Sequence, residues 1–469
     1  MSLRFRGLRL VDARRDEMGD LAIEGDRIVS VGKADAPDRV SGPLVDIDCA
    51  AGSGGRALVL MPAFVDLHVH FRDPGFPEKE SLESGLLAAA AGGFGTVAAM
   101  ANTRPVTDRA SQAIALRSRA LALGLADYFP VLAMTRGLEG KDLSHLEELS
   151  ALRDDEAARG EGGGLASASY SIRMISDDGR DLASDEVMLA AMRKAAALGL
   201  AVACHCEIGP ALVPPGSDAK SWYASEEGLA ADRAAEIRGV ERALRLARES
   251  DCAIHLCHLS TRESLDRVRE AKYRQGHRVS CEVTPHHLCL AAAEARDAGA
   301  AGRGRVNPWL RTDDDRLAMA EALADGTIDA IATDHAPHGE ADKEAGAPGF
   351  VGLETAFSLV HDRLCDPGEN IRGATRGGRD GRSGEARIGL RRLSRLMSLN
   401  PARILGLPDR GLLEVGSRAD LVLIDPGEEW LVDPGLFRSR GANSLLAGRA
   451  LRGRVIMTIH EGRIVHERH

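Results

Sequence analysis

The stretch PAFVDLHVH, at residues 62–70, decides the fold. It is an apolar run of strand length that ends in two histidines, and a helical stretch rich in Ala, Leu and Arg follows it. Seven more runs of this kind lie at residues 96–100, 128–135, 168–176, 200–206, 252–260, 279–287 and 330–338. Eight strand-and-helix units, with strands apolar enough to be buried on both faces, are typical of a (β/α)8 barrel. The sequence therefore predicts an α/β fold built on a TIM barrel.

The two ends of the chain share a different pattern. LRFRGLRLVDA and LAIEGDRIVSVG near the start, and ADLVLIDP and GRVIMTIHEGRIVHE near the end, look like short strands with turns. Neither end is long enough to form a good core alone, so we expect both to pack as one small β-sandwich domain. The predicted bounds are 1–57 and 411–469 for this domain and 58–410 for the barrel. Two Gly-rich, charged stretches, 156–164 and 370–387, predict mobile loops, and the second has no assigned role.

Composition narrows the class of protein. The chain has 469 residues, of which 44% are apolar and 28% charged, with a net charge of −10. This acidic balance argues against nucleic-acid binding but is compatible with a small anionic substrate. No run of about 18 apolar residues predicts a membrane span, and the first 20 residues lack the apolar segment of a signal peptide. Eight cysteines in so long a chain do not form a disulfide scaffold, so we expect a cytoplasmic protein.

Histidine and aspartate gather where the predicted strands end. In a strand, residues i and i+2 point to the same side, so both histidines of the HVH motif can face one metal ion. Any one of these side chains could instead be an ordinary core or capping residue. Their joint placement at the mouth of a barrel, where barrel active sites lie, favours a metal centre. The candidates are His68, His70, Asp177 or Asp178, His205, His258 and Asp334.

Imidazole and carboxylate ligands suit Zn²⁺, with Mn²⁺ or Co²⁺ as alternatives. The candidates are too many for one tetrahedral site, which favours two ions that share a carboxylate. Cys204, Cys206 and Cys257 are each adjacent to a candidate histidine, and strand alternation predicts that their thiols face the helix layer. For His255, His286 and His287 we expect packing roles or support of the metal ligands.

Longer motifs follow one another in a recognisable order. They are VDLHVHFRDPGFPEKES (65–81), GGFGTVAAMANTRPVTD (92–108), ISDDG, HCE, CHLSTRES, CEVTPHHL, RVNPWLR, ATDHAPH and PGFVGLET. The set resembles the class I dihydroorotases, a group of the amidohydrolase superfamily that is similar to allantoinases and dihydropyrimidinases. In the other groups a carboxylated lysine bridges the metals, and residues 162–178 contain no lysine here. The resemblance therefore favours class I and implies a distorted barrel with a terminal β domain.

The resemblance also implies a role for each site residue. His68, His70 and Asp334 would hold one Zn²⁺, and His205 and His258 the other. Asp178 would bridge the two ions, with Asp177 as the adjacent alternative. Asp334 would also be the general acid and base of catalysis. Arg72, Asn102 and His338 would bind the substrate carboxylate, for which the planar fork of arginine is suited, and Asn307 would line the pocket. An ion pair between Arg72 and Asp73 is the structural alternative.

The implied reaction is the reversible cyclisation of N-carbamoyl-L-aspartate to L-dihydroorotate and water, in de novo pyrimidine (UMP) biosynthesis. Residues 338–350, rich in Gly and Pro, are interpreted as a lid or as an ordinary surface connection. Ala101 and Trp309 stand where the family usually has proline, which affects loop rigidity and pocket shape.

Two alternatives remain open. One is another cyclic amidase, such as an allantoinase or dihydropyrimidinase. The other is a catalytically silent partner of aspartate transcarbamoylase, although every ligand position is filled. A homo-oligomer is expected, and association with that transcarbamoylase is compatible with an active enzyme.

Overall fold

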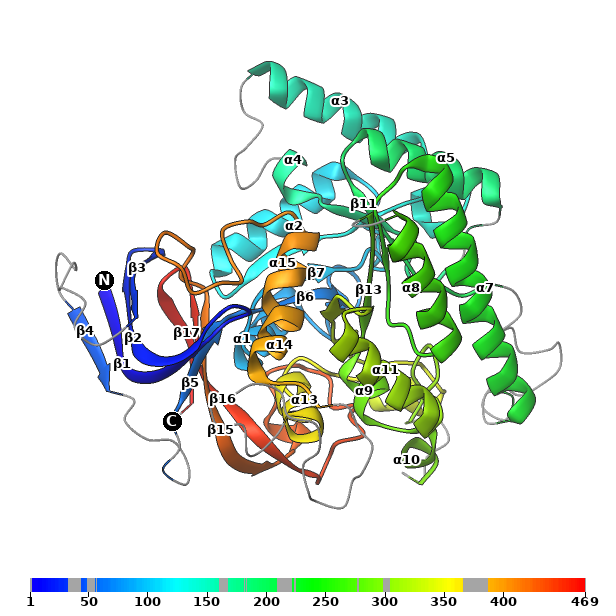
Figure 1. Ribbon diagram of the computed structural model, residues 1–469. Coiled ribbons are helices and arrows are strands. Elements are labelled where there is room, and N and C mark those ends of the chain that lie inside the picture. The colour runs from blue at the N-terminus through cyan, green and yellow to red at the C-terminus, as the bar shows by residue number, and fades with distance from the viewer. Residues whose placement is uncertain are drawn as a thin grey trace.

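Strands from both ends of the chain form one sheet in the computed structural model, which describes residues 2–32, 44–48, 55, 57–159, 168–180, 182, 184–208, 222, 225–275, 278–297, 304–365 and 387–468. The strand order is β17-β16-β15-β5-β1-β2-β3, with β4 paired to β1. The strands are β1 (Ser2–Val11), β2 (Asp16–Glu24), β3 (Arg27–Gly32), β4 (Leu44–Asp48), β5 (Val59–Pro62), β15 (Leu421–Leu431), β16 (Ala450–His460) and β17 (Arg463–Glu467). Figure 1 shows these blue and orange-red strands side by side.

Strand β5 joins the two ends because it pairs parallel with β1 and antiparallel with β15. The sheet has its own apolar core, in which Leu3, Phe5 and Leu10 from the start of the chain pack with Leu421 and Ile459 from its end. Burying this shared face provides the core that neither end could form alone. The prediction that both ends fold together is confirmed.

The barrel strands are parallel and follow the predicted order. They are β6 (Phe64–Val69), β7 (Phe94–Ala99), β8 (Asp127–Pro130), β9 (Leu132–Ala133), β10 (Met174–Ser176), β11 (Ala201–Cys204), β12 (Ile254–Leu256), β13 (Val279–Val283) and β14 (Ala330–Ile331). One predicted strand is divided at Val131 into β8, which pairs with β7, and β9, which pairs with β10. A parallel bridge between Val69 and His335 closes the ring between the first and last strands. The predicted distorted barrel is therefore confirmed.

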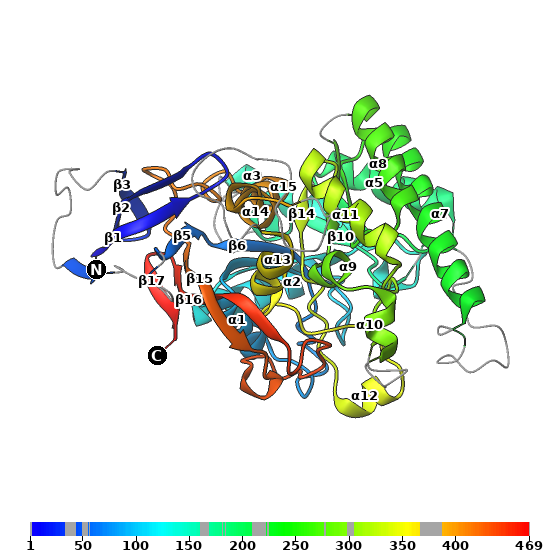
Figure 2. The same ribbon diagram turned by 60° about the horizontal axis from the view of Figure 1, so that its bottom comes forward.

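Helices surround this ring, and Figure 2 shows α7 and α8 on the side opposite the terminal sheet. The longer ones are α1 (Leu82–Ala91), α2 (Ala110–Leu123), α3 (Ser144–Arg159), α5 (Asp185–Ala197), α7 (Glu226–Ser250), α8 (Arg262–Gln275), α11 (Asp313–Asp325) and α13 (Ala356–Leu364). Shorter ones are α4 (Ala168–Ser171), α9 (Pro285–Cys289), α10 (Ala292–Asp297), α12 (Glu340–Glu344), α14 (Leu390–Ser394) and α15 (Asn400–Ile404), with a π-helical turn at Arg395–Leu399 and 3₁₀ turns at Arg136–Leu138 and Pro434–Leu436. Serine side chains cap the starts of three of them: Ser81 accepts a hydrogen bond from Ser84 N–H, Ser184 from Val187 N–H and Ser225 from Gly228 N–H. None of the helices within the described ranges is long and apolar enough to cross a membrane.

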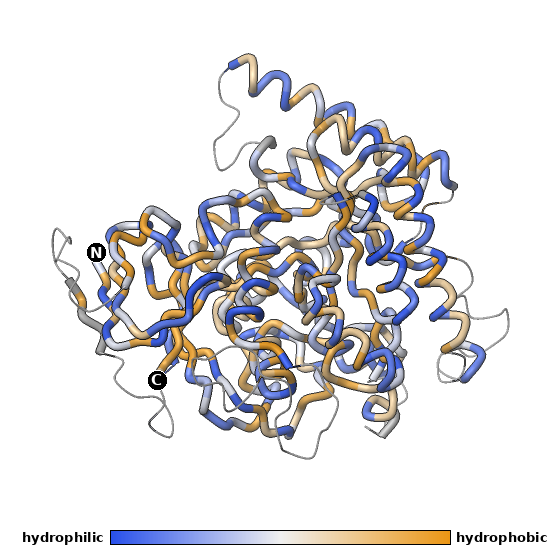
Figure 3. The backbone as a smooth tube through the Cα atoms, viewed as in Figure 1, coloured by the Kyte–Doolittle hydropathy of each residue, from blue (hydrophilic) through white to orange (hydrophobic). Residues whose placement is uncertain are grey.

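Two apolar layers position the functional end of the barrel. A large cluster fills the space between strands and helices, and a second one, with Val65, Leu67 and Ala203, fills the inside of the barrel. Figure 3 shows the apolar segments running through the centre of the molecule. Ala402 and Leu405 of the α15 region join the inner cluster. Ser398 donates a hydrogen bond to the carbonyl of Pro62, the last residue of β5, and Asn400 donates to that of Asp329, just before β14. The N-terminal end of the barrel is thus covered, and its C-terminal end is left for a site.

Two local predictions need correction. The run 168–176 was expected to be a strand, but residues 168–171 form helix α4 and only 174–176 pair in the sheet. Residues 156–159 were expected in a mobile loop, but they continue α3, because Glu, Ala and Arg favour a helix that has already begun. Residues 160–164, and the predicted loop 370–387 up to residue 386, lie outside the described residues.

Candidate metal centre

Each predicted metal ligand lies at or just after the C-terminal end of a barrel strand. His68 lies in β6, and His70 follows it. The other four follow β10, β11, β12 and β14 within about three residues of the strand end; they are Asp178, His205, His258 and Asp334. Because parallel strands end on one side of the barrel, these side chains converge at its mouth. All except the half-buried His205 are at most 6% exposed.

Asp178 lies between two groups of histidines. On one side, its carboxylate is 3.2 Å from His68 Nε2 and 3.6 Å from His70 Nε2, measured to its two oxygens. On the other, its ligand atom and those of His205 and His258 all lie within 4.8 Å of one another. Asp334 Oδ1 completes the first group, 3.1 Å from His70 Nε2 and 3.7 Å from His68 Nε2. Within the described residues, this arrangement provides two neighbouring sets of potential ligands with one shared carboxylate.

Several of these buried atoms lack hydrogen bonds, which fits a bound cation. His68 Nε2, Asp178 Oδ1 and His205 Nδ1 have no hydrogen-bond partner among the described residues. Buried polar atoms in folded proteins are nearly always satisfied, so a cluster of exceptions at one place requires an explanation. Nitrogen and carboxylate ligands aimed at one another are suited to a divalent metal ion. The donor set therefore fits the metal that the sequence predicts.

The pKa values of two carboxyls and one histidine of the site agree with this interpretation. Burial opposes ionisation of Asp178 and Asp334, but the neighbouring histidines outweigh it and hold the pKa of both carboxyls well below the usual range. Burial, with the charges of His205 and His68, lowers the pKa of His258 to about 3. The carboxylates are thus ionised and His258 is neutral at physiological pH, which are the protonation states that metal ligands require.

The predicted substrate-binding residues surround the same centre. The Asn102 amide oxygen is 2.9 Å from His70 Nδ1, and its nitrogen donates to Asp178 at 3.0 Å. The Arg72 guanidinium lies 3.2 Å from His338 Nε2, whereas Asp73 forms its ion pair with Arg119.

Asn307 reaches the centre from the opposite side. Its amide nitrogen is 3.3 Å from His205 Nε2 and donates to Glu207 at 3.0 Å. The structure thus brings all four predicted substrate-binding residues to the mouth of the barrel.

Comparison with known proteins decides the family. Residues 59–465 match the amidohydrolase family. The chain belongs to that family. A dihydroorotase of Geotalea daltonii is 36% identical to this amidohydrolase over the full length of both chains. A dihydroorotase of Geobacillus sp. strain WCH70 is 40% identical over 87% of this chain and 88% of its own, and one of Bacillus subtilis is 35% identical over 96% and 94%.

Solved structures show the same architecture. The L-hydantoinase (dihydropyrimidinase) of Arthrobacter aurescens superposes with a TM-score of 0.78 at 25% identity, covering 99% of this chain and 96% of its own. A dihydropyrimidinase of Brevibacillus agri superposes with a TM-score of 0.76 at 21% identity, covering 100% and 95%. The second likeness concerns the fold alone.

The structure separates the two adjacent aspartates that the sequence left as alternatives. Asp177 accepts the backbone N–H of Thr135 at 2.8 Å and also the hydroxyl of Thr135. Burial raises the pKa of Asp177, whereas the pKa of Asp178 is lowered. Asp177 therefore binds the neighbouring loop, and Asp178 is the carboxylate that faces the histidines.

One site residue escaped the sequence analysis. Glu282, in β13, is fully buried, and its carboxylate lies 3.0 Å from His68 Nδ1 and 2.9 Å from His255 Nε2. Burial opposes its ionisation, but the two histidines lower the pKa of Glu282 to about 2. The signal was present in the sequence, because an acidic residue inside an apolar barrel strand needs a buried partner.

The prediction for the cysteines is correct for Cys204 and Cys206, which pack in the cluster between strands and helices. It is wrong for Cys257, which lies inside the barrel, with its sulfur within 4.8 Å of ligand atoms of His68 and Glu282. Strand β12 ends at Leu256 and His258 has a φ of 33°, so strict alternation does not hold there. Burial raises the pKa of the Cys257 thiol to about 12, which makes it a poor metal ligand.

The backbone at the centre adopts uncommon conformations. Arg72, His258 and Asp334 are non-glycine residues with φ of 55°, 33° and 46°. Such conformations cost about 1–3 kcal/mol each and persist where the surrounding structure imposes them, often at functional sites. All three residues are candidates for metal or substrate binding in this amidohydrolase.

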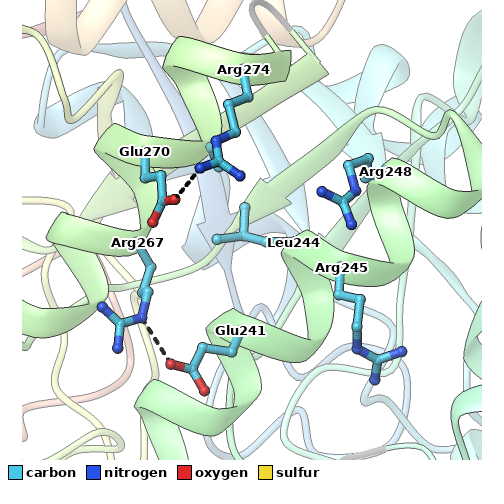
Figure 4. Close-up of a pocket in the computed structure, with 8 residues that line it drawn as sticks. Glu241, Leu244, Arg245, Arg248, Arg267, Glu270 and Arg274 are labelled. Carbon is cyan, nitrogen blue, oxygen red and sulfur yellow. Dashed lines mark hydrogen bonds and ion pairs between the residues drawn. The ribbon is translucent and has the colours of Figure 1, made fainter.

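A separate groove lies between α7 and α8 (Figure 4), with a volume of about 250 Å³. Its charges are largely paired with one another, since Arg267 bonds to Glu241 at 2.8 Å and Arg274 to Glu270 at 2.8 Å. None of the predicted site residues lines it. The groove is therefore distinct from the candidate metal centre.

Proposed function

We propose that this amidohydrolase is a dihydroorotase that interconverts N-carbamoyl-L-aspartate and L-dihydroorotate in pyrimidine biosynthesis. The observation that carries the proposal is the position of Asp178 between two groups of histidines, in a stretch, residues 162–178, whose sequence contains no lysine. The relatives named dihydroorotase, which match over most or all of the chain, support the substrate assignment. Allantoinase or dihydropyrimidinase activity is supported only by structural likeness at 25% identity or less.

The proposed metal ligands are the six residues that converge at the barrel mouth. His68, His70 and Asp334 would hold one Zn²⁺, His205 and His258 the other, and Asp178 both. When bound, such ions polarise a carbonyl group and lower the pKa of water toward neutrality. The filled ligand set argues against a catalytically silent partner of aspartate transcarbamoylase.

Arg72 and His338 would bind the carboxylate of the substrate. Burial, with the charge of Arg72, lowers the pKa of His338 to about 3, so its ring is neutral. His338 Nε2 faces the Arg72 guanidinium, while His338 Nδ1 has no hydrogen-bond partner among the described residues. A neutral ring that accepts at Nε2 carries its proton on Nδ1. This N–H and the remaining guanidinium donors can bind one carboxylate together, and Asn102 and Asn307 would line the rest of the pocket.

Asp334 would carry the proton between the attacking water and the ring nitrogen of the substrate. Its low pKa makes it an ionised base, and its carboxylate lies beside His70 at the centre of the site. In the hydrolytic direction it would take a proton from the attacking water and give it to the ring nitrogen as the carbon–nitrogen bond breaks. In cyclisation it would take the proton of the ureido nitrogen, and the side-chain carboxyl group would lose water.

The test is turnover of L-dihydroorotate by the purified, zinc-loaded protein, with allantoin and dihydrouracil as competing substrates. We expect hydrolysis of L-dihydroorotate alone, and loss of that activity in Asp334→Asn. Turnover of allantoin or dihydrouracil in preference to L-dihydroorotate would assign another cyclic amidase. An Asp334→Asn variant with a near-normal rate would contradict the assigned proton transfer.

We further propose a cytoplasmic homo-oligomer with domain bounds 1–57, 58–410 and 411–469. The seven cysteines of the described residues form no disulfide with one another, which supports a reducing compartment. Light scattering of the protein alone and mixed with aspartate transcarbamoylase tests both the oligomer and the proposed association. If the protein had the mass of a single chain in both samples, the proposed oligomer and the proposed association would both be contradicted.

A further inference from the structure

A chain of hydrogen bonds extends from the candidate metal centre into the floor of the barrel. His68 Nδ1 lies 3.0 Å from one oxygen of Glu282, and His255 Nε2 lies 2.9 Å from the other. His255 Nδ1 in turn lies 2.9 Å from Ser280 Oγ. Glu282, His68 and His255 are at most 1% exposed, so this chain of hydrogen bonds is buried.

Protons on this chain can be assigned from donor and acceptor chemistry. An ionised carboxylate only accepts hydrogen bonds, so each ring nitrogen that faces Glu282 must donate. His68 therefore carries a proton on Nδ1. When the ring binds a metal, it keeps this proton and offers the lone pair of Nε2, the atom that faces Asp178 and has no hydrogen-bond partner among the described residues. This is the tautomer that a metal ligand bound through Nε2 requires.

The chain is built on rigid elements. His255 and Ser280 are register partners in the parallel pair β12–β13, and Glu282 pairs with Ala330 in the next strand. The Glu282 carboxylate meets the ring of His68, which β6 carries, on the inside of the barrel. Three adjacent strands thus fix the position of the carboxylate that holds the His68 ring.

We propose that Glu282 and His255 are positioning residues that fix the tautomer and ring orientation of His68 for metal binding. The proposal rests on the proposed metal centre. Carboxylates that accept from the second nitrogen of a metal-bound histidine increase its basicity and hold its ring. Glu282 performs this role for His68, and His255 holds Glu282 in place.

The test compares the metal affinity of variants rather than their activity. Glu282→Met removes the acceptor at similar size and is expected to weaken zinc binding about 10- to 100-fold, as measured by competition with a chromogenic chelator. Glu282→Gln keeps one acceptor oxygen but not the charge, and we expect a loss in the same direction of about tenfold or less. His255→Gln, which acts only through Glu282, should have the smallest effect.

Asp420→Asn is the matched control, because Asp420 forms a buried pair with His460 at 3.1 Å in the terminal sheet. It should lower the thermal stability of the metal-free protein without changing the zinc affinity of the folded chain. Wild-type zinc affinity in both Glu282 variants would overturn the proposal, and if Glu282→Met does not fold, Glu282→Gln alone decides. Zinc affinity can be measured even if L-dihydroorotate is not a substrate, so failure of the proposed function would be seen separately.

Discussion

At the scale of single residues, Asp177 and Asp178 differ in the direction in which their carboxylates point. Both are buried, but one bonds to the Thr135 loop and the other faces four histidines. Asp178→Asn is expected to lower the zinc content and abolish turnover, because the shared ligand is weakened. Asp177→Asn should keep its zinc and lose about 1–3 kcal/mol of stability, because a buried hydrogen-bond pattern is disturbed. Metal analysis with thermal unfolding checks both, and the reverse pattern would make Asp177 the bridge.

Arg72 provides a second prediction at this scale. Arg72→Lys keeps the charge but loses the planar fork, so kcat/KM for L-dihydroorotate should fall about 10- to 100-fold, mainly through KM. Arg119→Lys is the control, since Arg119 is exposed and pairs with Asp73 away from the centre. Steady-state kinetics of the two variants would contradict the carboxylate-binding role if both resembled the wild type.

The sequence predicted which residues would meet but not how each one points. Strand ends and spacing were sufficient to collect the histidines and Asp334 at one mouth, and the family resemblance added Arg72. They could not separate Asp177 from Asp178, because the chain has left β10 at that point and alternation no longer applies. Glu282 was missed for the opposite reason: it lies within a strand, where the search for residues at strand ends did not extend.

At the scale of elements, the segment predicted as a lid is anchored by one buried amine. Lys343 in α12 donates to the carbonyl oxygens of Arg305, Ala347 and Gly349 at 3.0, 2.8 and 2.9 Å. The ammonium group has three N–H donors, one for each carbonyl. The bond to Arg305 links the segment 338–350 to the neighbourhood of Asn307. Movement of this segment as a lid stays a prediction.

Lys343→Met tests this anchor. It leaves three carbonyls without their donor, which should cost about 1–3 kcal/mol and lower kcat/KM while the zinc content is unchanged. Lys79→Met is the matched control, because Lys79 pairs with Asp342 of the same segment at its more exposed surface, at 3.1 Å. Limited proteolysis should cleave near residues 339–347 faster only in Lys343→Met. Equal cleavage of both variants would contradict the anchoring role.

Element boundaries were predicted less well than element order. The order of the barrel strands follows from the apolar runs, since burial on both faces leaves a strong signal. Residues 168–171 were also predicted to belong to an apolar strand, but they form a helical turn before β10. A short apolar run fits either conformation, and only the packing of neighbouring elements decides between them.

At the scale of the whole molecule, a buried ion network joins the base of the barrel to the terminal sheet. Asp127, at the start of β8, lies 2.8 Å from Arg410 and 3.1 Å from Arg418, and Arg418 lies 2.9 Å from Asp420. All four residues are at most 6% exposed. The network couples the stability of the two parts, whose exact bounds stay a prediction.

Arg410→Met should therefore destabilise the whole chain by about 1–3 kcal/mol, because it removes one of the cations that pair with buried Asp127 and leaves Arg418 and Arg117. Arg14→Met, which removes a surface pair with Glu414, should cost less than about 1 kcal/mol. Denaturant unfolding of both variants measures the difference. Equal midpoints would show that the buried network contributes little.

The most direct measurement is a titration of metal-free protein with Zn²⁺, in which bound metal per chain and L-dihydroorotate turnover are followed together. The account predicts that turnover rises to its maximum at about two ions per chain and stays absent in Asp178→Asn at every zinc concentration. Full turnover without metal, or no turnover at about two bound ions per chain, would contradict a dihydroorotase whose two metals share Asp178.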